Sequence, residues 1–289
     1  MKSTLLPLLG ALVLAGATHA ATLDSATVTR VYNDVRIYPP GSSAKPATVG
    51  STIRGRTSLQ TGRNSRSELR FQDDTLTRLG QNSVFSFQQG TRDLQLEQGT
   101  LLLQVPKRAG GARIRTATVT AAITGTTVMM EYHKDKWCKI IVLEGTLDAY
   151  LNKGQRRVTI KPGQMLVMPA NAQRIPKPVD VDVQRLQKTS KLAGTKVFPA
   201  LPDVAQNRIN QTVAKQQTMI KTGALAPPKP RDAAAPDAAR APVPAPEIPP
   251  AIARTSRTVQ AVQAVQNTGN SVRVPQRELR WWERRPRTP

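Results

Sequence analysis

Residues 67–87 read SELRFQDDTLTRLGQNSVFSF, and this stretch decides the fold class. Apolar and polar residues alternate over residues 68–71, 75–79 and 83–87, and the runs stop at turn-forming groups, Asp73-Asp74 and Gly80-Gln81-Asn82. Alternation with period two over a few residues is typical of half-buried strands, whereas helices repeat near every 3.6 residues. The stretch therefore predicts three successive strands joined by short turns.

Similar runs lie on both sides of this stretch. They occupy residues 28–31, 93–97, 100–105, 113–119, 139–143, 146–151, 157–160 and 164–168. Short strands that recur about every ten residues are typical of all-β proteins. We therefore expect an all-β domain over residues 21–175, built as a β-sandwich or as a stacked β-roll.

The composition changes after residue 175. Residues 176–224 show weak helical periodicity, at 181–192 and 204–220, which predicts one or two surface helices on the β-domain. Residues 227–250 contain nine prolines interleaved with alanine. Such a segment lacks the backbone donors and the apolar area that folding needs, so we expect residues 225–289 to form a disordered, basic, Pro/Ala-rich tail.

The first twenty residues indicate export. Lys2 precedes an uncharged apolar stretch, and Thr18 and Ala20 place small residues at −3 and −1 of a cut after Ala20. These features predict a cleavable signal peptide over residues 1–20, because the apolar stretch is too short to span a bilayer. No later segment is apolar enough for a transmembrane helix. We expect a soluble, periplasmic protein, and His133 as its one histidine after cleavage.

Cys138 is the one cysteine of the chain. An odd cysteine in an oxidising compartment either pairs with another chain or stays free. It begins a strand-like run without a neighbouring histidine or second cysteine to activate it, so the favoured interpretation is a buried thiol. The sequence leaves both alternatives open.

The strand-rich region resembles a FecR domain, the periplasmic sensing domain of bacterial iron-transport regulators. The resemblance covers roughly residues 28–170 and rests on short fragments in the right order. They are Val49-Gly50, residues 59–62, 67–71, 75–83, 96–101, 114–118, 123–126, 142–147 and 160–164. It implies the fold and a periplasmic binding domain.

Two departures limit what the resemblance implies. Asp73-Asp74-Thr75 stands where the family has Asp-Gly-Ser, which changes little because aspartate also tolerates the turn. Regulators of the family carry a cytoplasmic sigma-factor-binding segment and a transmembrane helix before the domain. Here a cleavable signal precedes it, so we expect no anti-sigma role.

The fragments contain recurring glycines that predict turns rather than a ligand site. Glycine permits a positive φ at strand ends at little steric cost. The predicted turn glycines are Gly62, Gly80, Gly99, Gly125, Gly145 and Gly163.

The sequence favours a protein that is not an enzyme. Asp73-Asp74 is the one adjacent acidic pair and stands in a predicted turn. Glu131 and Asp135 flank His133, but residues 132–136 have the composition of a solvated hairpin loop. No hydrolase or metalloprotease motif is present, so we predict no catalytic residue, no metal site and no cofactor.

The net charge of +23 indicates an anionic partner. Export argues against nucleic acid, which leaves envelope proteins and the anionic polymers or lipids of the envelope. The tail concentrates the charge around two adjacent tryptophans, and tryptophan anchors both protein interfaces and membrane surfaces. An equal alternative is that the tail folds back onto the β-domain. The candidate partner-binding residues are Arg280, Trp281, Trp282, Arg284 and Arg285.

These observations favour a non-catalytic binding or scaffold protein of the periplasm. Its FecR-like domain would dock an envelope protein or polymer, and its tail would contribute to attachment. Two alternatives stay open: a structural assembly factor that forms homo-oligomers through exposed edge strands, and a signal-sensing module of a regulatory system.

Overall fold

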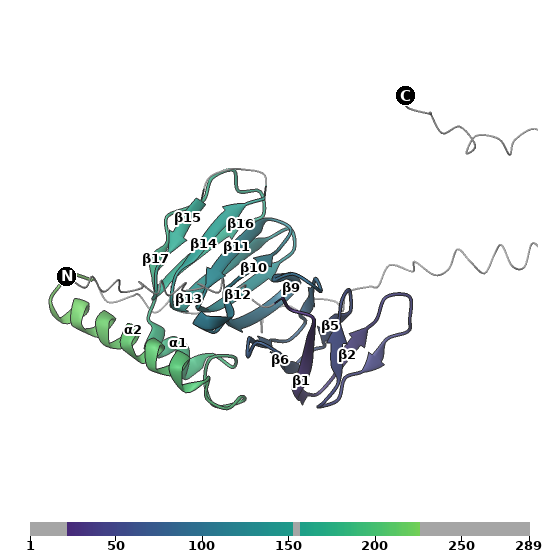
Figure 1. Ribbon diagram of the computed structural model, residues 1–289. Coiled ribbons are helices and arrows are strands. Elements are labelled where there is room, and N and C mark those ends of the chain that lie inside the picture. The colour runs from purple at the N-terminus through teal and green to yellow at the C-terminus, as the bar shows by residue number, and fades with distance from the viewer. Residues whose placement is uncertain (1–21, 153–156, 226–289) are drawn as a thin grey trace, which may run out of the picture. The chain divides into compact units, whose positions relative to one another are not determined.

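A computed structural model describes residues 22–152 and 157–225 (Figure 1). The predicted signal peptide and the predicted tail after residue 225 lie outside these residues. The elements are β1 (Ser25–Tyr32), β2 (Val35–Tyr38), β3 (Lys45–Pro46), β4 (Thr52–Arg54), β5 (Ser58–Thr61), β6 (Arg66–Phe71), β7 (Leu76–Leu79), β8 (Val84–Phe87), β9 (Asp93–Gln104), a 3₁₀ turn (Lys107–Ala109), β10 (Gly111–Arg115), β11 (Val119–Thr124), β12 (Thr127–His133), β13 (Trp137–Glu144), β14 (Leu147–Leu151), β15 (Arg157–Ile160), β16 (Gln164–Pro169), β17 (Val179–Asp180), α1 (Val183–Thr189) and α2 (Asp203–Lys221).

The strands form two sheets that share β9. The first, here the helix-side sheet, has the order β4-β1-β6-β7-β9-β12-β13-β16-β17. The second, here the open sheet, has the order β3-β2-β5-β8-β9-β10-β11-β14-β15. Pairing is antiparallel except between β9 and β10. From β10 onward, successive hairpins alternate between the sheets, which is the stacked β-roll arrangement.

Gly99 is the point at which β9 passes from one sheet to the other. Residues before it pair with β8 and β10, and residues from it onward pair with β12. Its φ is +95°, and a Cβ there would lie 2.5 Å from the Cα of Ser83. Only glycine fits such a bend without strain. The two runs predicted at 93–97 and 100–105 are therefore one strand.

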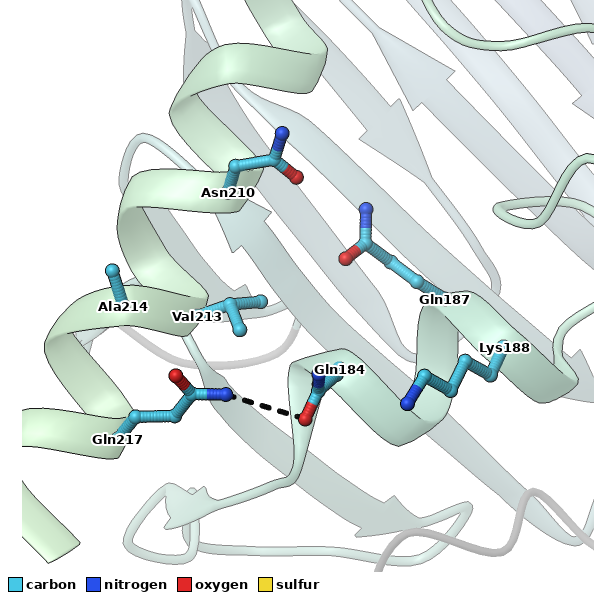
Figure 2. A pocket seen from close by; sticks show the side chains of 7 residues that line it. All are labelled: Gln184, Gln187, Lys188, Asn210, Val213, Ala214 and Gln217. Carbon is cyan, nitrogen blue, oxygen red and sulfur yellow. Dashed lines mark hydrogen bonds between the residues drawn. The ribbon is translucent and has the colours of Figure 1, made fainter.

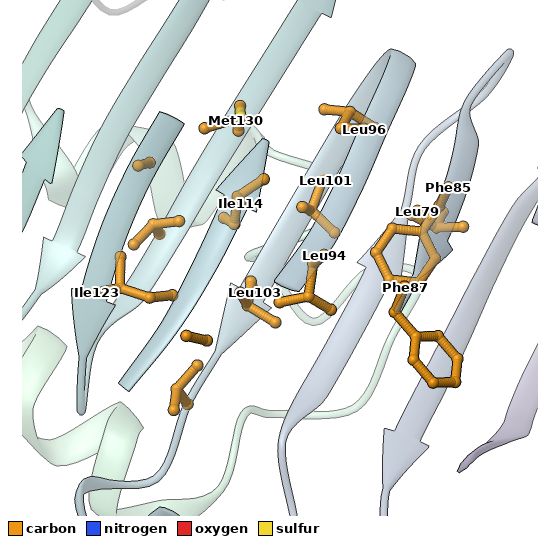
Figure 3. Packing of buried hydrophobic residues seen from close by; sticks show 14 of the residues in the cluster. Leu79, Phe85, Phe87, Leu94, Leu96, Leu101, Leu103, Ile114, Ile123 and Met130 are labelled. Atoms are coloured by element: carbon orange, nitrogen blue, oxygen red, sulfur yellow. The ribbon is translucent and has the colours of Figure 1, made fainter. Parts of the chain in front are cut away.

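The main core lies between the two sheets (Figure 3). Leu79, Leu101 and Leu103 point inward from the helix-side sheet, and Phe85, Leu94 and other residues meet them from the open sheet. Alternate residues of each strand enter this core because successive side chains of a strand point to opposite faces. The predicted period-two pattern therefore reports the core correctly.

A second core lies between the outer face of the helix-side sheet and the two helices. Met129, Ile141 and Leu143 of the sheet pack with Leu186 of α1 and Ile209 of α2, among others. Figure 1 shows both helices beside β13. Asp182 caps α1 by accepting a hydrogen bond from the backbone N–H of Arg185 at 2.8 Å. Helix α1 lies within the predicted segment 181–192, α2 extends one residue beyond each end of the predicted segment 204–220, and β17 lies between residue 175 and α1.

Several boundaries differ from the sequence-based predictions. The run predicted at 113–119 ends at Arg115, because the Thr116 side chain closes a turn onto Val119. Strand β12 was not predicted, since all of its residues except His133 are buried and it shows no alternation. Strands covered on both faces lose the period-two pattern. The loop predicted at 132–136 is shorter, because Tyr132 and His133 still belong to β12.

Candidate functional site

Three buried glutamates lie on the helix-side sheet. Glu68, Glu131 and Glu144 are 5%, 7% and 2% exposed. A buried carboxylate needs a cation or hydrogen-bond donors, since desolvation otherwise disfavours the charge. The surroundings of each glutamate therefore decide whether it is available for chemistry.

Glu68 is held by Arg78, whose side chain is fully buried. Nε of Arg78 lies 2.8 Å from Oε2 of Glu68. Its two terminal nitrogens donate to the carbonyl oxygens of Leu192 and Pro199, each at 2.8 Å, and its guanidinium lies over the Phe198 ring. Burial lowers the pKa of Arg78, and the hydrogen bond to Glu68 opposes that shift. Arg78 thus ties the segment after α1 to the sheet.

Glu131 lies between a lysine and the histidine predicted to be in a loop. Nζ of Lys139 lies 2.6 Å from Oε2 of Glu131, and Nε2 of His133 lies 3.0 Å from Oε1. The Trp137 ring contacts both side chains: its centroid lies 4.4 Å from that of His133 and 5.2 Å from Nζ of Lys139. Burial alone would raise the pKa of Glu131, but the hydrogen bond from His133 and the charge of Lys139 outweigh it, and the net shift is downward.

Glu144 has the weakest compensation of the three. It accepts a hydrogen bond from the Thr127 hydroxyl at 2.8 Å, and Nη1 of Arg208 on α2 lies 3.8 Å from its other oxygen. Burial raises the pKa of Glu144, and the Thr127 bond and the Arg208 charge only partly oppose the shift. The Arg208 contact connects α2 to the end of β13.

These arrangements are structural rather than catalytic. Each carboxylate is occupied by groups that belong to the fold, and none faces a described pocket. His133 is a quarter exposed, but one of its ring nitrogens is taken by Glu131. A general acid or base needs a free path to a substrate proton. The earlier interpretation of residues 132–136 as a solvated loop is wrong for Tyr132, which is 2% exposed.

A shallow groove of about 400 Å³ runs between α1 and α2 (Figure 2). Four amide side chains and Lys188 line it together with Val213 and Ala214. Gln217 donates to Gln184 across the groove at 3.3 Å. Amides both donate and accept hydrogen bonds, so the groove offers mainly neutral polar contacts, with Lys188 as its one charged side chain among the lining residues.

The predicted sites lie in different parts of the molecule. The tail residues Arg280, Trp281, Trp282, Arg284 and Arg285 lie outside the described residues. Asp73 and Asp74 form the β6–β7 turn, where Asp74 has a φ of +64° and Asp73 accepts from the Thr75 backbone at 2.9 Å.

The six predicted turn glycines divide into two groups. Four have positive φ: Gly99, Gly125, Gly145 and Gly163. Gly62 and Gly80 do not, and close packing explains them. A Cβ on Gly80 would lie 3.1 Å from the Cβ of Thr100, and one on Gly62 would lie 3.1 Å from Asp34. Both still lie directly after a strand, at the start of a turn, but the close approach of a neighbouring segment, rather than a positive φ, accounts for glycine at these two positions.

Cys138 is buried in the main core and is a free thiol. Burial raises its pKa to about 12. A thiol that is 1% exposed is inert toward other chains. The structure therefore favours the buried-thiol alternative over pairing between chains.

Within residues 22–152 and 157–225, no helix has both the length and the apolar character to cross a membrane. Among residues 22–152 and 157–225, no group of three or more histidine, cysteine, aspartate or glutamate side chains is arranged to hold a metal ion.

The sequence analysis did not predict that charged side chains such as Arg78 are buried, and the reason is the same in each case. Arg78 occupies a polar position in the run 75–79, and alternation assigns such positions to solvent. It is buried because Leu192 and Pro199, more than a hundred residues later, pack over it. A local pattern contains no information about such a cover.

Comparison with known proteins gives a match to one family model over part of the chain. The family model described as FecR protein matches residues 57–148, which run from the start of β5 into β14. The chain contains a FecR domain. Two crystal structures of a proposed anti-sigma factor from Parabacteroides distasonis ATCC 8503 are similar, with 13% and 12% identity and a TM-score of 0.39 for each. Each alignment covers 45% of this chain and 63% of the other. No curated protein matches the chain.

The match to the FecR family model supports the signal-sensing alternative better than the docking of an envelope polymer. The match confirms the resemblance inferred from the order of the sequence fragments. It extends over a shorter range than the roll, because β1 to β4 and the helical cover lie outside it.

Proposed function

We propose that this chain is an exported, non-catalytic sensing module of a regulatory system, which acts by binding a protein partner in the periplasm. The FecR match over residues 57–148 carries the proposal. The geometry supports it, because the buried carboxylates are engaged within the fold and the described groove is lined mainly by amide side chains.

Export can be tested without knowing the partner. Alkaline phosphatase fused after residue 289 becomes active only when the fusion reaches an oxidising compartment. We expect activity, and N-terminal sequencing should find a mature protein that begins at Ala21. Replacing Leu12 and Leu14 by arginine should abolish activity, since a charged apolar region no longer enters the export pathway. An active fusion with Met1 retained would contradict cleavage.

The role of the tail in partner binding needs a matched pair of variants. Cross-linking and affinity capture from envelope extract should recover a defined protein with the full chain. The change Trp281→Ala/Trp282→Ala should reduce recovery, while Gln266→Ala/Asn267→Ala in the same tail should not. Recovery that persists in the tryptophan variant would place attachment elsewhere. Recovery of salt-sensitive lipid alone would overturn the sensing role.

A further inference from the structure

Four arginines lie together on the part of the helix-side sheet that the helices leave uncovered. They are Arg30 on β1, Arg54 on β4, and Arg66 and Arg70 on β6, and we call them the arginine strip. Strand β1 lies between β4 and β6, with Ser25 opposite Arg54 and Thr27 opposite Arg70. In the part of the chain that the structure describes, the segment after α1 contacts this side of the sheet at β7, through Arg78, and at Tyr32, which lies opposite Arg66 and donates to the Val197 carbonyl.

The four arginine side chains lie on one face of the sheet, because successive side chains of a strand point to opposite faces. Arg66 and Arg70 stand two residues before and after Glu68, whose side chain meets Arg78 and Arg30 on the outer face. Arg54 follows Ile53, which is fully buried in the main core, so its own side chain points outward. The side chains of Arg30 and Arg70 are 45% and 46% exposed.

The positive charge of the strip is only partly compensated. Arg30 lies 3.7 Å from Glu68, but that carboxylate is already engaged by Arg78 at 2.8 Å. Arg70 lies 3.6 Å from Asp74, which Arg108 contacts at 2.6 Å. Arg54 and Arg66 form no ion pair with any part of the chain that the structure describes. The strip thus holds more guanidinium groups than carboxylates.

We propose that the arginine strip is a docking surface for an extended acidic segment of a protein partner. Guanidinium groups bind carboxylates in a planar, bidentate manner. Thr27 and Thr52 lie between the arginines, and their small side chains leave space in which an extended chain can lie against the sheet. Membrane-binding faces combine cations with exposed large apolar side chains, whereas the exposed side chains of the strip are arginine and threonine.

The inference rests on the proposed binding role and gives the chemistry of one partner. Its test is fluorescence anisotropy of the full mature chain with labelled decaglutamate at physiological ionic strength. The strip variant is Arg54→Gln/Arg66→Gln, because these side chains leave no carboxylate unpaired. The matched control is Arg174→Gln/Arg185→Gln, which removes equal charge at described positions that lie after β16. Far-UV circular dichroism checks that both variants fold.

We expect the strip variant to weaken decaglutamate binding roughly tenfold, and the control variant by less than about twofold. Equal weakening by both variants would mean that net charge alone attracts the peptide and would overturn the inference. So would an absence of binding by the unaltered chain. Vesicles of phosphatidylcholine and phosphatidylglycerol form a second arm, and strip-dependent vesicle binding without strip-dependent peptide binding would assign the surface to a membrane instead.

Failure of this inference is separable from failure of the proposed function. The capture experiment depends on a physiological partner and on the tail, whereas decaglutamate binding depends on neither. If decaglutamate binding did not depend on the strip while the capture experiment still recovered a protein, only the proposal for the arginine strip would be overturned. Intact strip-dependent binding without any captured protein would count against the sensing role.

Discussion

The two outer faces of the roll both carry arginine–carboxylate contacts between neighbouring strands, but they differ in solvent access. On the helix-side face, Arg78 and Glu68 are buried beneath the segment that follows α1. On the open face, Arg113 and Arg115 both contact Asp93, and their side chains are 59% and 48% exposed. The same chemistry therefore holds tertiary structure on one face and contributes little on the other, since water competes for exposed ion pairs.

The largest effect is expected from Arg78→Met. The change leaves Glu68 buried without its main partner and two carbonyl oxygens without donors, so the free energy of unfolding should fall by about 3 to 5 kcal/mol. Urea denaturation followed by circular dichroism measures it. Arg70→Met on the exposed part of the same sheet is the control and should cost less than about 1 kcal/mol. The double change Glu68→Gln/Arg78→Met should recover part of the loss. A cost for Arg78→Met as small as that of the control would erase the distinction between the faces.

A smaller effect is expected from Lys139→Met. Glu131 would keep the hydrogen bond with His133, so the free energy of unfolding should fall by about 2 to 3 kcal/mol rather than by the full cost of a broken buried pair. Lys136→Met, three residues earlier in the exposed hairpin turn, should change it by less than about 0.5 kcal/mol. The same denaturation experiment compares them. Equal costs would show that the Glu131 contact contributes nothing.

Glu131 and Glu144 should change the dependence of folding stability on pH in opposite directions. The pKa of Glu131 is lowered in the folded state, so its contribution is present above the unfolded value of 4.5 and is lost as pH falls through the lowered value. The pKa of Glu144 is raised, so its charge opposes folding as pH rises from 4.5 through the raised value.

Thermal melting of two variants over a pH series separates these contributions. Glu131→Gln should reduce the loss of stability in acid. Glu144→Gln should reduce the loss of stability as pH rises above 4.5, with an effect on the order of 1 kcal/mol for each unit by which the pKa is displaced. Matching pH profiles for the two variants would contradict the opposite shifts.

The smallest effect is expected on the open face. Arg113→Gln removes the contact with Asp93 at 2.8 Å, but Arg115 still pairs with the same carboxylate at 3.0 Å. The free energy of unfolding should change by less than about 1 kcal/mol. Added salt should abolish the difference between this variant and the unaltered chain. A cost near that of Arg78→Met would mean that exposure does not decide the value of these pairs.

Much of the roll could be predicted from local patterns. Alternation in 68–71 and 83–87 predicts β6 and β8 to within a residue or two, because alternate residues of these strands enter the main core. The run 75–79 also predicts β7, although every residue of that strand is buried. Strand β12 escaped prediction because the helices cover its second face, and Met129 therefore stands beside Val128 as a buried residue. The helices themselves were foreseen only weakly, since α2 shows a narrow apolar stripe among glutamines.

The sequence alone determined the fold class, the FecR resemblance and the excess of positive charge, because these depend on composition, on neighbouring residues and on the order of short motifs. Tertiary structure decided which charged side chains are buried and which are exposed. Arg78 and Arg70 belong to adjacent strands and look alike in the sequence, yet one is fully buried and the other is about half exposed. The difference arises from a segment more than a hundred residues later in the chain, which packs over Arg78 on β7 and leaves Arg70 exposed. Burial by a distant segment is a property of chain topology, and a local pattern cannot encode it.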